Sequence, residues 1–334
     1  MKVGKLLQSL ALGELLGEPV EVKGGLLHKM YRVSTSNGVF AVKVLNSEIM
    51  KRPAALRNTV NAEKIAAAFE GILPVVASLE IQGKQIHEFE GSYYMVFPWV
   101  EGRSVFPKEI NEKNCETMGD ILGRMHSADI ALADVEPEGE DTVLFEWDYY
   151  LQKAKEQEAQ TGNWLAQYEN AVHDIKAWNQ GAYEAQEIVA QTRVISHRDL
   201  DPKNVMWNGV KPLVIDWEAA GYVNPYQEFL EVLNYWADDG EGSLVRSYFD
   251  ALVTAYRKYV SLTDVAWDKV FAGSYTGMLG WLAYNLKRAL GIEAADEEEI
   301  RLGAEEVKGT IGALYAYCDK VERMKDWLGI KKGR

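Results

Sequence analysis

Two short polar segments in the second half of the chain carry residues suited to transferring a phosphoryl group. The first runs from His197 to Asn204 and contains Asp199, and the second begins at Asp216 after an apolar run. Phosphoryl transfer needs a carboxylate that orients the attacking hydroxyl and accepts its proton, together with oxygen ligands for magnesium. Asp199 is the candidate base, and Asn204 and Asp216 are the candidate ligands. A polar loop that only forms turns is the alternative, but two such segments in order favour the catalytic interpretation.

A lysine and a glutamate in the first part of the chain form a second candidate group. Strand alternation over residues 39–45 places Lys43 on an otherwise apolar face, and in the helix predicted next, Glu63 lies on the apolar stripe. A buried lysine and a buried glutamate are each costly alone and plausible together. Such a pair would hold the lysine against nucleotide phosphates. The alternative is that Lys43 extends to water and Glu63 lies at the edge of the stripe.

A pair of glycines, Gly24 and Gly25, lies between the first two predicted strands. Backbone amides in such a turn can cover phosphate groups. An ordinary tight turn also favours glycine, so the sequence leaves both interpretations open.

The elements that must position these residues begin with a β-rich part. Ser36-Asn37-Gly38 between two β-rich runs indicates a hairpin, and Pro53 followed by alanines indicates the start of a helix. One helix is predicted over residues 53–70. Strands are predicted over residues 19–23, 29–34, 39–45, 75–81, 85–89 and 93–100.

The rest of the chain has mainly helical patterns. Helices are predicted over residues 112–127, 144–190 and 226–327, with breaks at Gly162 and Gly181. Short strands are predicted at 194–196, 205–207 and 213–215. The expected fold class is therefore α+β, with a β-rich N-terminal lobe (residues 1–100) and an α-rich C-terminal lobe (residues 101–334).

Charge and cysteine content narrow the classes of partner. The chain has 36 Lys and Arg against 50 Asp and Glu, which gives a net charge of −14. Such a field repels nucleic acid and attracts a cationic substrate, although solubility alone also explains an acidic balance.

Two cysteines far apart in sequence, Cys115 and Cys318, argue against a disulfide framework and fit a cytoplasmic protein. The N-terminus is expected to form an amphipathic helix, and no apolar run is long enough to span a membrane.

The order of these motifs resembles the aminoglycoside phosphotransferase and choline kinase family, which has a protein-kinase-like fold. The resemblance covers about residues 20–232 and rests on the segment from His197 to Asn204, on Ile215-Asp216-Trp217-Glu218 and on Pro98-Trp99-Val100-Glu101-Gly102. It implies a bilobal fold with ATP or GTP and Mg²⁺ between the lobes. Residues 1–100 would bind the nucleotide, and residues 101–334 would hold the catalytic and acceptor-binding groups.

The same resemblance assigns a role to each matching residue. Asp199 would be the catalytic base, and Asn204 and Asp216 would be the magnesium ligands. Lys43 would clamp the phosphates, with Glu63 as its partner. Further nucleotide contacts would come from the turn at Gly24 and Gly25, from the carbonyl of Pro98 and the amide of Val100 at the adenine edge, and from Ala41 and Phe97 in the adenine pocket.

Two positions depart from the usual pattern of these small-molecule kinases. Arg198 stands where glycine is common in these small-molecule kinases, and Asp201 stands where many of them have histidine. Asp216 is followed by Trp-Glu and not by the Phe-Gly of protein kinases, and no Ala-Pro-Glu segment comes later, which argues against a protein substrate. The roles of Asp201 and Glu218 stay open.

We therefore expect a kinase that moves the γ-phosphate of ATP or GTP to a hydroxyl of a small, cationic, amine-bearing molecule. An aminoglycoside-like antibiotic is favoured, with choline, ethanolamine, homoserine, thiamine or a sugar as other acceptors. A non-catalytic nucleotide-binding protein is the rival from another class. Two sets of residues in the helical part are candidates to surround a cation: the acidic residues Asp148, Glu156, Glu158, Glu228, Glu231, Asp238, Asp239 and Glu241, and the aromatic residues Trp147, Tyr149, Tyr150, Tyr235 and Trp236.

Overall fold

The computed structural model describes residues 2–22, 28–133, 135–136, 142–157, 164–294 and 296–330. Gly24, Gly25, Glu158 and Gly162 lie outside these described residues, so the structure does not test the predictions made for them.

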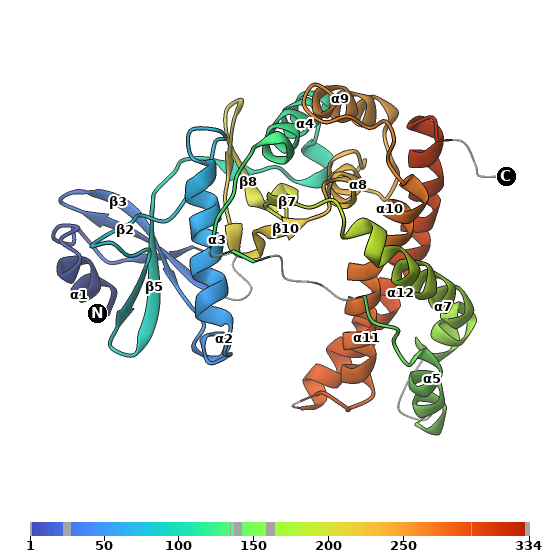
Figure 1. Cartoon of the computed structure of the whole chain (residues 1–334). Helices are drawn as coiled ribbons and strands as arrows, with labels where there is room; N and C mark the ends of the chain where they lie inside the picture. Colours follow the sequence, from blue (N-terminus) through green and yellow to red (C-terminus); the bar gives the residue numbers. More distant parts are fainter. Residues whose placement is uncertain are drawn as a thin grey trace.

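An antiparallel five-stranded sheet forms the N-terminal lobe, on the left of Figure 1. Its strand order is β1-β2-β3-β5-β4, and the helices of this lobe are α1, α2 and α3. The hairpin predicted at Asn37-Gly38 joins β2 to β3, with Thr35 paired to Gly38. The bounds are α1 Lys2–Ser9, β1 Val20–Val22, β2 Lys29–Thr35, β3 Gly38–Val44, α2 Ser47–Met50, α3 Ala55–Phe69, β4 Ile86–Phe89 and β5 Ser92–Pro98.

The predicted amphipathic helix at the N-terminus is confirmed as α1. Leu6 and Leu7 are buried, and they share a hydrophobic cluster with Val33 of β2 and Val42 of β3. The helix thus covers one face of the sheet with its apolar side, as the spacing of its leucines requires.

The strand predicted over residues 75–81 is wrong. Its backbone bonds go to separate segments: Val76 N donates to Val214 O of the C-terminal lobe at 2.9 Å, Leu79 N donates to Val96 O of β5 at 2.7 Å, and Ile81 N donates to Lys84 O at 2.8 Å. Because its backbone bonds are divided between the two lobes, no continuous ladder forms. The segment instead joins the lobes beside α3.

The C-terminal lobe is mainly helical and surrounds a small group of strands (Figure 1). β6 pairs with β8, β8 with β9, and β7 with β10. The strands are β6 Arg103–Ser104, β7 Val194–Ser196, β8 Val205–Asn208, β9 Lys211–Val214 and β10 Gly221–Val223. The helices are α4 Glu112–Ser127, α5 Trp147–Glu156, α7 Trp164–Val189, α8 Pro225–Trp236, α9 Arg246–Tyr256, α10 Trp267–Gly273, α11 Thr276–Ala289 and α12 Glu297–Trp327, with short 3₁₀ turns η1 Pro107–Glu109, η2 Pro202–Asn204 and η3 Trp217–Ala219.

Most helix predictions for this lobe are confirmed, but the break expected at Gly181 is wrong, since α7 continues through it. Glycine costs a helix about 1 kcal/mol, and α7 makes extensive tertiary contacts with α5, α10 and α12. Packing of this kind outweighs the local cost of one glycine.

Gly102 allows the connection between the lobes to lie directly on the C-terminal lobe. Its φ is +150°, and a Cβ at this position would lie 2.8 Å from the backbone oxygen of Trp207 in β8. Any side chain would therefore force the connection away from β8.

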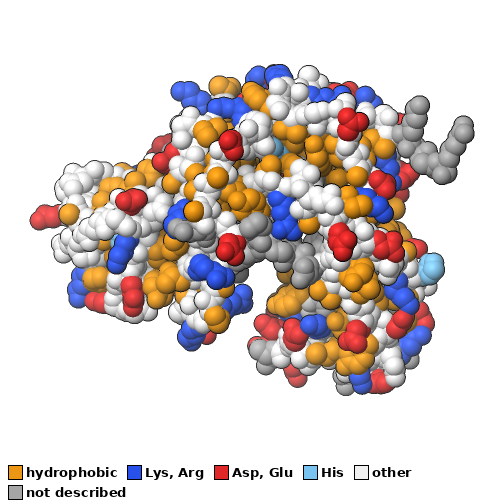
Figure 2. Space-filling model, in the orientation of Figure 1, with side chains coloured by type: hydrophobic (Ala, Val, Ile, Leu, Met, Phe, Trp, Pro, Cys, Tyr) orange, Lys and Arg blue, Asp and Glu red, His pale blue; other side chains and the backbone are white. Residues whose placement is uncertain are grey.

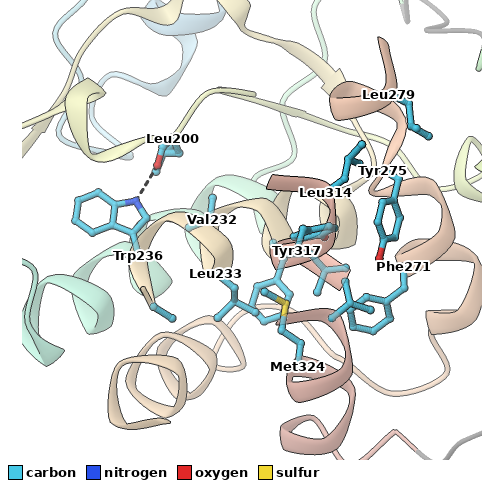
Figure 3. Packing of buried hydrophobic residues seen from close by; sticks show 14 of the residues in the cluster. Leu200, Val232, Leu233, Trp236, Phe271, Tyr275, Leu279, Leu314, Tyr317 and Met324 are labelled. Carbon is cyan, nitrogen blue, oxygen red and sulfur yellow. Dashed lines mark hydrogen bonds between the residues drawn. The ribbon is translucent and has the colours of Figure 1, made fainter. Parts of the chain in front are cut away.

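The core of the C-terminal lobe is built around α8, whose apolar face packs against α10 and α12 (Figure 3). Val232 and Leu233 of α8 lie in one cluster with Phe271 of α10 and Tyr317 of α12.

Figure 2 shows a deep notch between the β-rich lobe and the far end of the helical lobe. In the part of the chain that is described, no helix is both long and apolar enough to cross a bilayer.

Candidate active site

A buried histidine fixes the start of the loop that carries the predicted base. His197 follows β7, has no exposed surface, and its Nε2 lies 2.9 Å from the carbonyl oxygen of Ile215. Asp199 N donates to His197 Nδ1 at 3.3 Å. Burial lowers the pKa of His197, which favours a neutral ring that donates from Nε2 and accepts at Nδ1. One imidazole thus connects the backbone of Asp199 to the residue before Asp216.

A buried carboxylate supports the next residue of the loop. Arg198 has a positive φ of 65°, a conformation that is costly for a residue with a side chain. Its N–H donates to Glu228 Oε1 at 2.7 Å, and Glu228 Oε2 lies 2.8 Å from His126 Nε2. Burial alone would raise the pKa of Glu228, but the contacts with His126 and Arg198 lower it. Glu228 was predicted to face the acceptor; its complete burial instead makes it the anchor of the loop.

The loop is also attached to the hydrophobic core. Trp236 Nε1 donates to the carbonyl oxygen of Leu200 at 2.8 Å, which Figure 3 shows as a dashed line. Both side chains are buried, so the residue after Asp199 is held by α8. Trp236, predicted as a possible wall for a cationic acceptor, belongs to the core, as do Trp147 and Tyr150.

Asp199 and Asn204 contact each other directly, as their spacing predicts. Asn204 Nδ2 donates to Asp199 O at 2.9 Å and to Asp199 Oδ2 at 2.8 Å. The Asp199 side chain is 35% exposed, and its other oxygen, Oδ1, accepts no hydrogen bond from the described residues. Asp199 is thus held in place through one carboxylate oxygen while the other stays accessible, which is what a general base requires.

The structure gives Asp201 a local role that the sequence left open. Its Oδ1 accepts a hydrogen bond from Lys203 N at 2.8 Å and so caps the short turn η2. Ser104 Oγ of β6 donates to Lys203 O at 2.8 Å. The turn between Asp199 and Asn204 is therefore fixed at both its amide and its carbonyl.

Lys43 reaches across from β3 to the loop that starts at Asp216. Lys43 Nζ lies 3.1 Å from Asp216 Oδ1 and also forms an ion pair with Glu218. Burial alone would lower the pKa of Lys43, but these carboxylates raise it. Asp216 adopts a left-handed conformation with φ 60°, which turns the chain sharply after β9. The prediction that Lys43 is buried and faces inward is confirmed.

Glu218 has a second partner that sequence reasoning missed. His28 Nε2 lies 3.2 Å from Glu218 Oε1, and Asn46 N donates to His28 Nδ1 at 2.9 Å. Since Nδ1 accepts, Nε2 carries the proton and donates to Glu218. Burial alone would raise the pKa of Glu218, but His28 and Lys43 lower it to about 2. The only sequence signal for His28 was its place just after the predicted glycine turn.

Glu63 is buried, as predicted, but its direct pairing with Lys43 is not found. Glu63 Oε2 accepts a hydrogen bond from Ser78 N at 2.9 Å, while Lys43 makes its ion pairs with Asp216 and Glu218. Burial raises the pKa of Glu63, and the charge of Lys43 opposes this. Glu63 is thus near enough to interact electrostatically with Lys43, but two carboxylates of the C-terminal lobe lie closer.

Asn204 and Asp216 fit the expected magnesium site because each has a side-chain oxygen that can bind the ion. The Asn204 amide donates through Nδ2, which leaves its Oδ1 as an uncommitted acceptor. Ile215 N donates to Asn204 O at 2.9 Å, so the two segments are joined next to both side chains. Amide and carboxylate oxygens are ligands that Mg²⁺ accepts, with phosphate oxygens and water completing its shell. The described residues contain no cluster of three or more His, Cys, Asp or Glu that could hold a metal on its own.

The residues predicted to meet the adenine lie at the end of the sheet and on the connection. Ala41 of β3 is paired with Phe97 of β5 across the sheet, and both are half-buried. Pro98 and Val100 line a cavity of about 320 Å³ together with Leu213 and the segment 75–80. Ala41 and Phe97 are not among the residues that line this cavity.

Glu231 is the acidic residue whose environment distinguishes it from the others predicted around the acceptor. It lies one turn after Glu228 on α8 and accepts a hydrogen bond from Tyr235 OH at 3.2 Å. Burial, Glu228 and Asp199 raise the pKa of Glu231 to about 7. Several other predicted acidic residues are paired with lysines: Asp148 with Lys176, Glu156 with Lys153, Asp238 with Lys320 and Glu241 with Lys108.

Comparison of the sequence with protein families gives one match of wide coverage. The model of the phosphotransferase enzyme family matches residues 19–260. No protein of curated function matches the sequence significantly.

Solved structures share the fold at low sequence identity. A spectinomycin phosphotransferase in complex with ADP and spectinomycin is 10% identical, with a TM-score of 0.69 over 95% of this chain and 98% of that chain. An amicoumacin kinase in complex with AMP-PNP and calcium is 11% identical, with a TM-score of 0.58 over 92% and 93%. A choline/ethanolamine kinase family protein from Mesorhizobium loti is 15% identical, with a TM-score of 0.56 over 96% and 95%. The bilobal, kinase-like fold expected from the motifs is confirmed.

Proposed function

This chain belongs to the phosphotransferase enzyme family and is a small-molecule kinase, and we propose that it transfers the γ-phosphate of ATP or GTP to a hydroxyl of a small, amine-bearing molecule. One observation carries the proposal further than the family does. Asp199 is held through Oδ2 by Asn204 and keeps Oδ1 accessible, beside a pair of oxygen donors for magnesium.

The proposed reaction assigns one step to each group. Asp199 Oδ1 accepts the proton of the acceptor hydroxyl, whose oxygen attacks the γ-phosphorus. The bond from the γ-phosphorus to the bridging β–γ oxygen breaks, and the nucleoside diphosphate leaves. Asn204 and Asp216 would hold Mg²⁺, which when bound neutralises charge on the phosphates. Lys43 would contact the α and β phosphates.

A cationic acceptor is supported by the charge around Asp199. Glu228, Glu231 and Asp199 lie close enough for the first and last to raise the pKa of Glu231. A protonated amine beside Glu231 would stabilise its charged form and be bound in return. We favour an aminoglycoside-like antibiotic, because the solved structures of similar fold include antibiotic kinases bound to their antibiotics.

Choline, ethanolamine, homoserine, thiamine or a sugar is the alternative acceptor, and a choline/ethanolamine kinase family protein is among the structures of similar fold. A panel of these compounds and of aminoglycosides, incubated with nucleotide and magnesium, separates the two classes by the product that gains phosphate. Nucleotide binding without transfer to any acceptor would instead favour a non-catalytic binding protein.

We also propose that residue 100 divides the nucleotide-binding lobe from the catalytic lobe and that the protein is cytoplasmic.

A further inference from the structure

We propose that Lys203 is a further catalytic residue, whose ammonium group binds the phosphoryl group as it passes from nucleotide to acceptor. The proposal rests on the proposed function, because it takes Asp199 as the base and Asn204 as a magnesium ligand. It adds a cationic contact that no motif in the sequence assigned.

The backbone of Lys203 is fixed between those two residues. Its N–H donates to Asp201 Oδ1 at 2.8 Å, and its carbonyl accepts from Ser104 Oγ at 2.8 Å. The backbone N–H and carbonyl of Lys203 are therefore both hydrogen-bonded, and Lys203 lies inside the turn η2 between Asp199 and Asn204. These two bonds fix the direction in which the Lys203 side chain leaves the turn.

The side chain of Lys203 lies beside one particular oxygen of the base. Lys203 Nζ is 3.7 Å from Asp199 Oδ2, and Asn204 Nδ2 donates to the same Oδ2 at 2.8 Å. The ammonium therefore lies toward the side of the carboxylate that faces the proposed magnesium ligand. Oδ1, the oxygen left for the acceptor hydroxyl, is not its partner. Phosphates bridged to a magnesium ion on Asn204 would lie on this same side of Asp199.

The contact with Asp199 alone does not account for this arrangement. The Lys203 side chain is 65% exposed, and an exposed ion pair contributes only about 0–1 kcal/mol to stability. At 3.7 Å the pair is also longer than a charge-assisted hydrogen bond, so the ammonium keeps its capacity to bind oxygen. Lysine has three donors on a flexible stem of four carbons, which suits a group that must follow a moving phosphoryl.

The charge distribution of the site makes such a cation useful. Lys43, the other lysine of the site, already pairs with Asp216 and Glu218. Asp199 adds a further negative charge beside Lys203. During transfer the γ-phosphoryl spreads its charge over three oxygens, and a cation beside those oxygens stabilises the transition state. Lys203 is positioned to be that cation.

The test compares two nucleotides that differ in the γ-phosphoryl group. Titration calorimetry in magnesium measures the affinities of AMP-PNP and of ADP for the wild type and for Lys203→Ala. The proposal predicts that Lys203→Ala weakens AMP-PNP about five- to tenfold and changes ADP by less than twofold, with Lys203→Arg restoring most of the AMP-PNP affinity. Lys211→Ala, an exposed lysine at the start of β9, is the matched control and should change neither affinity.

Equal losses for both nucleotides, or none for AMP-PNP, would overturn the assignment of Lys203. A wild type that binds neither nucleotide would instead contradict the proposed function, so the two failures are distinguishable. Once an acceptor is identified, Lys203→Ala should lower kcat at least tenfold with little change in the KM for that acceptor. An increase confined to the KM for the acceptor would assign Lys203 to the acceptor and contradict the proposal.

Discussion

Lys43 Nζ of β3 lies 3.1 Å from Asp216 Oδ1 at the start of η3. This ion pair joins the sheet of the N-terminal lobe to the loop that would hold magnesium. Lys43 is 8% exposed, and a charge buried to this degree is retained only with partners. The position of Lys43, which we propose to bind phosphate, thus depends on how the two lobes meet.

Replacing Lys43 with Met should lower kcat by about a hundredfold or more, because a preorganised cation is lost where charge develops. Lys84→Met, an exposed lysine in the same lobe, serves as the control. Steady-state kinetics with varied nucleotide measures the effect. A Lys43→Met enzyme within threefold of the wild type would remove Lys43 from the mechanism.

Two conservative variants of His28 separate its two contacts. Asn can replace Nδ1 as acceptor for Asn46 N but does not reach Glu218, whereas Gln can donate to Glu218 and loses Asn46. If the Glu218 contact positions the phosphate side of the site, His28→Asn should lower kcat about tenfold, and His28→Gln should retain most of it. Kinetics and thermal unfolding of both variants supply the comparison, and equal losses in kcat would assign His28 a structural role only.

Removing the Glu228 carboxylate should destabilise the protein, because Glu228 anchors the loop that carries Asp199. Glu228→Ala leaves Arg198 N and His126 Nε2 without their acceptor in the core, at a cost of about 3–5 kcal/mol in the free energy of unfolding. Glu241→Ala, where the ion pair with Lys108 is exposed, should cost less than about 1 kcal/mol. Chemical denaturation of the two variants measures the difference, and similar costs would show that Glu228 is not an anchor.

The stability of the protein should depend on pH through Glu231. Its pKa in the folded protein is about 7, above its ordinary value, so folding favours the protonated form. This contribution is complete below about pH 4.5 and is lost as the pH rises through about 7. Glu231→Gln removes this dependence, so the stability of the variant relative to the wild type should rise by about 2–3 kcal/mol between pH 5 and pH 8. A stability difference that stays constant over this range would exclude the raised pKa.

The sequence predicted the parts of the site whose geometry is local. Asp199 and Asn204 are five residues apart on one turn, so their contact follows from the spacing of the motif. Strand alternation was sufficient to place Lys43 inward. In each case the controlling interactions lie within one element or one loop.

The rest of the site depends on contacts between distant segments. The partner of Lys43 was predicted wrongly as Glu63, because the choice between Glu63 and Asp216 is made by the packing of the lobes. His28 contacts Glu218, which lies 190 residues further along the chain. Glu228 contacts Arg198, which lies 30 residues before it. Residues 75–81 have strand-like side chains, yet their backbone partners lie in two lobes. The pattern of residue types along the chain does not predict such contacts between distant segments.

The central claim is that Asp199 accepts the proton of the acceptor hydroxyl. Asp199→Asn keeps the shape of the side chain and its oxygen acceptor for Asn204, but it cannot act as a base. Transfer of labelled γ-phosphate to the best acceptor of the panel should fall by at least a thousandfold in this variant, while its affinity for Mg·ADP stays within about threefold of the wild type. Retention of more than a tenth of the wild-type transfer rate, with nucleotide binding intact, would contradict the account.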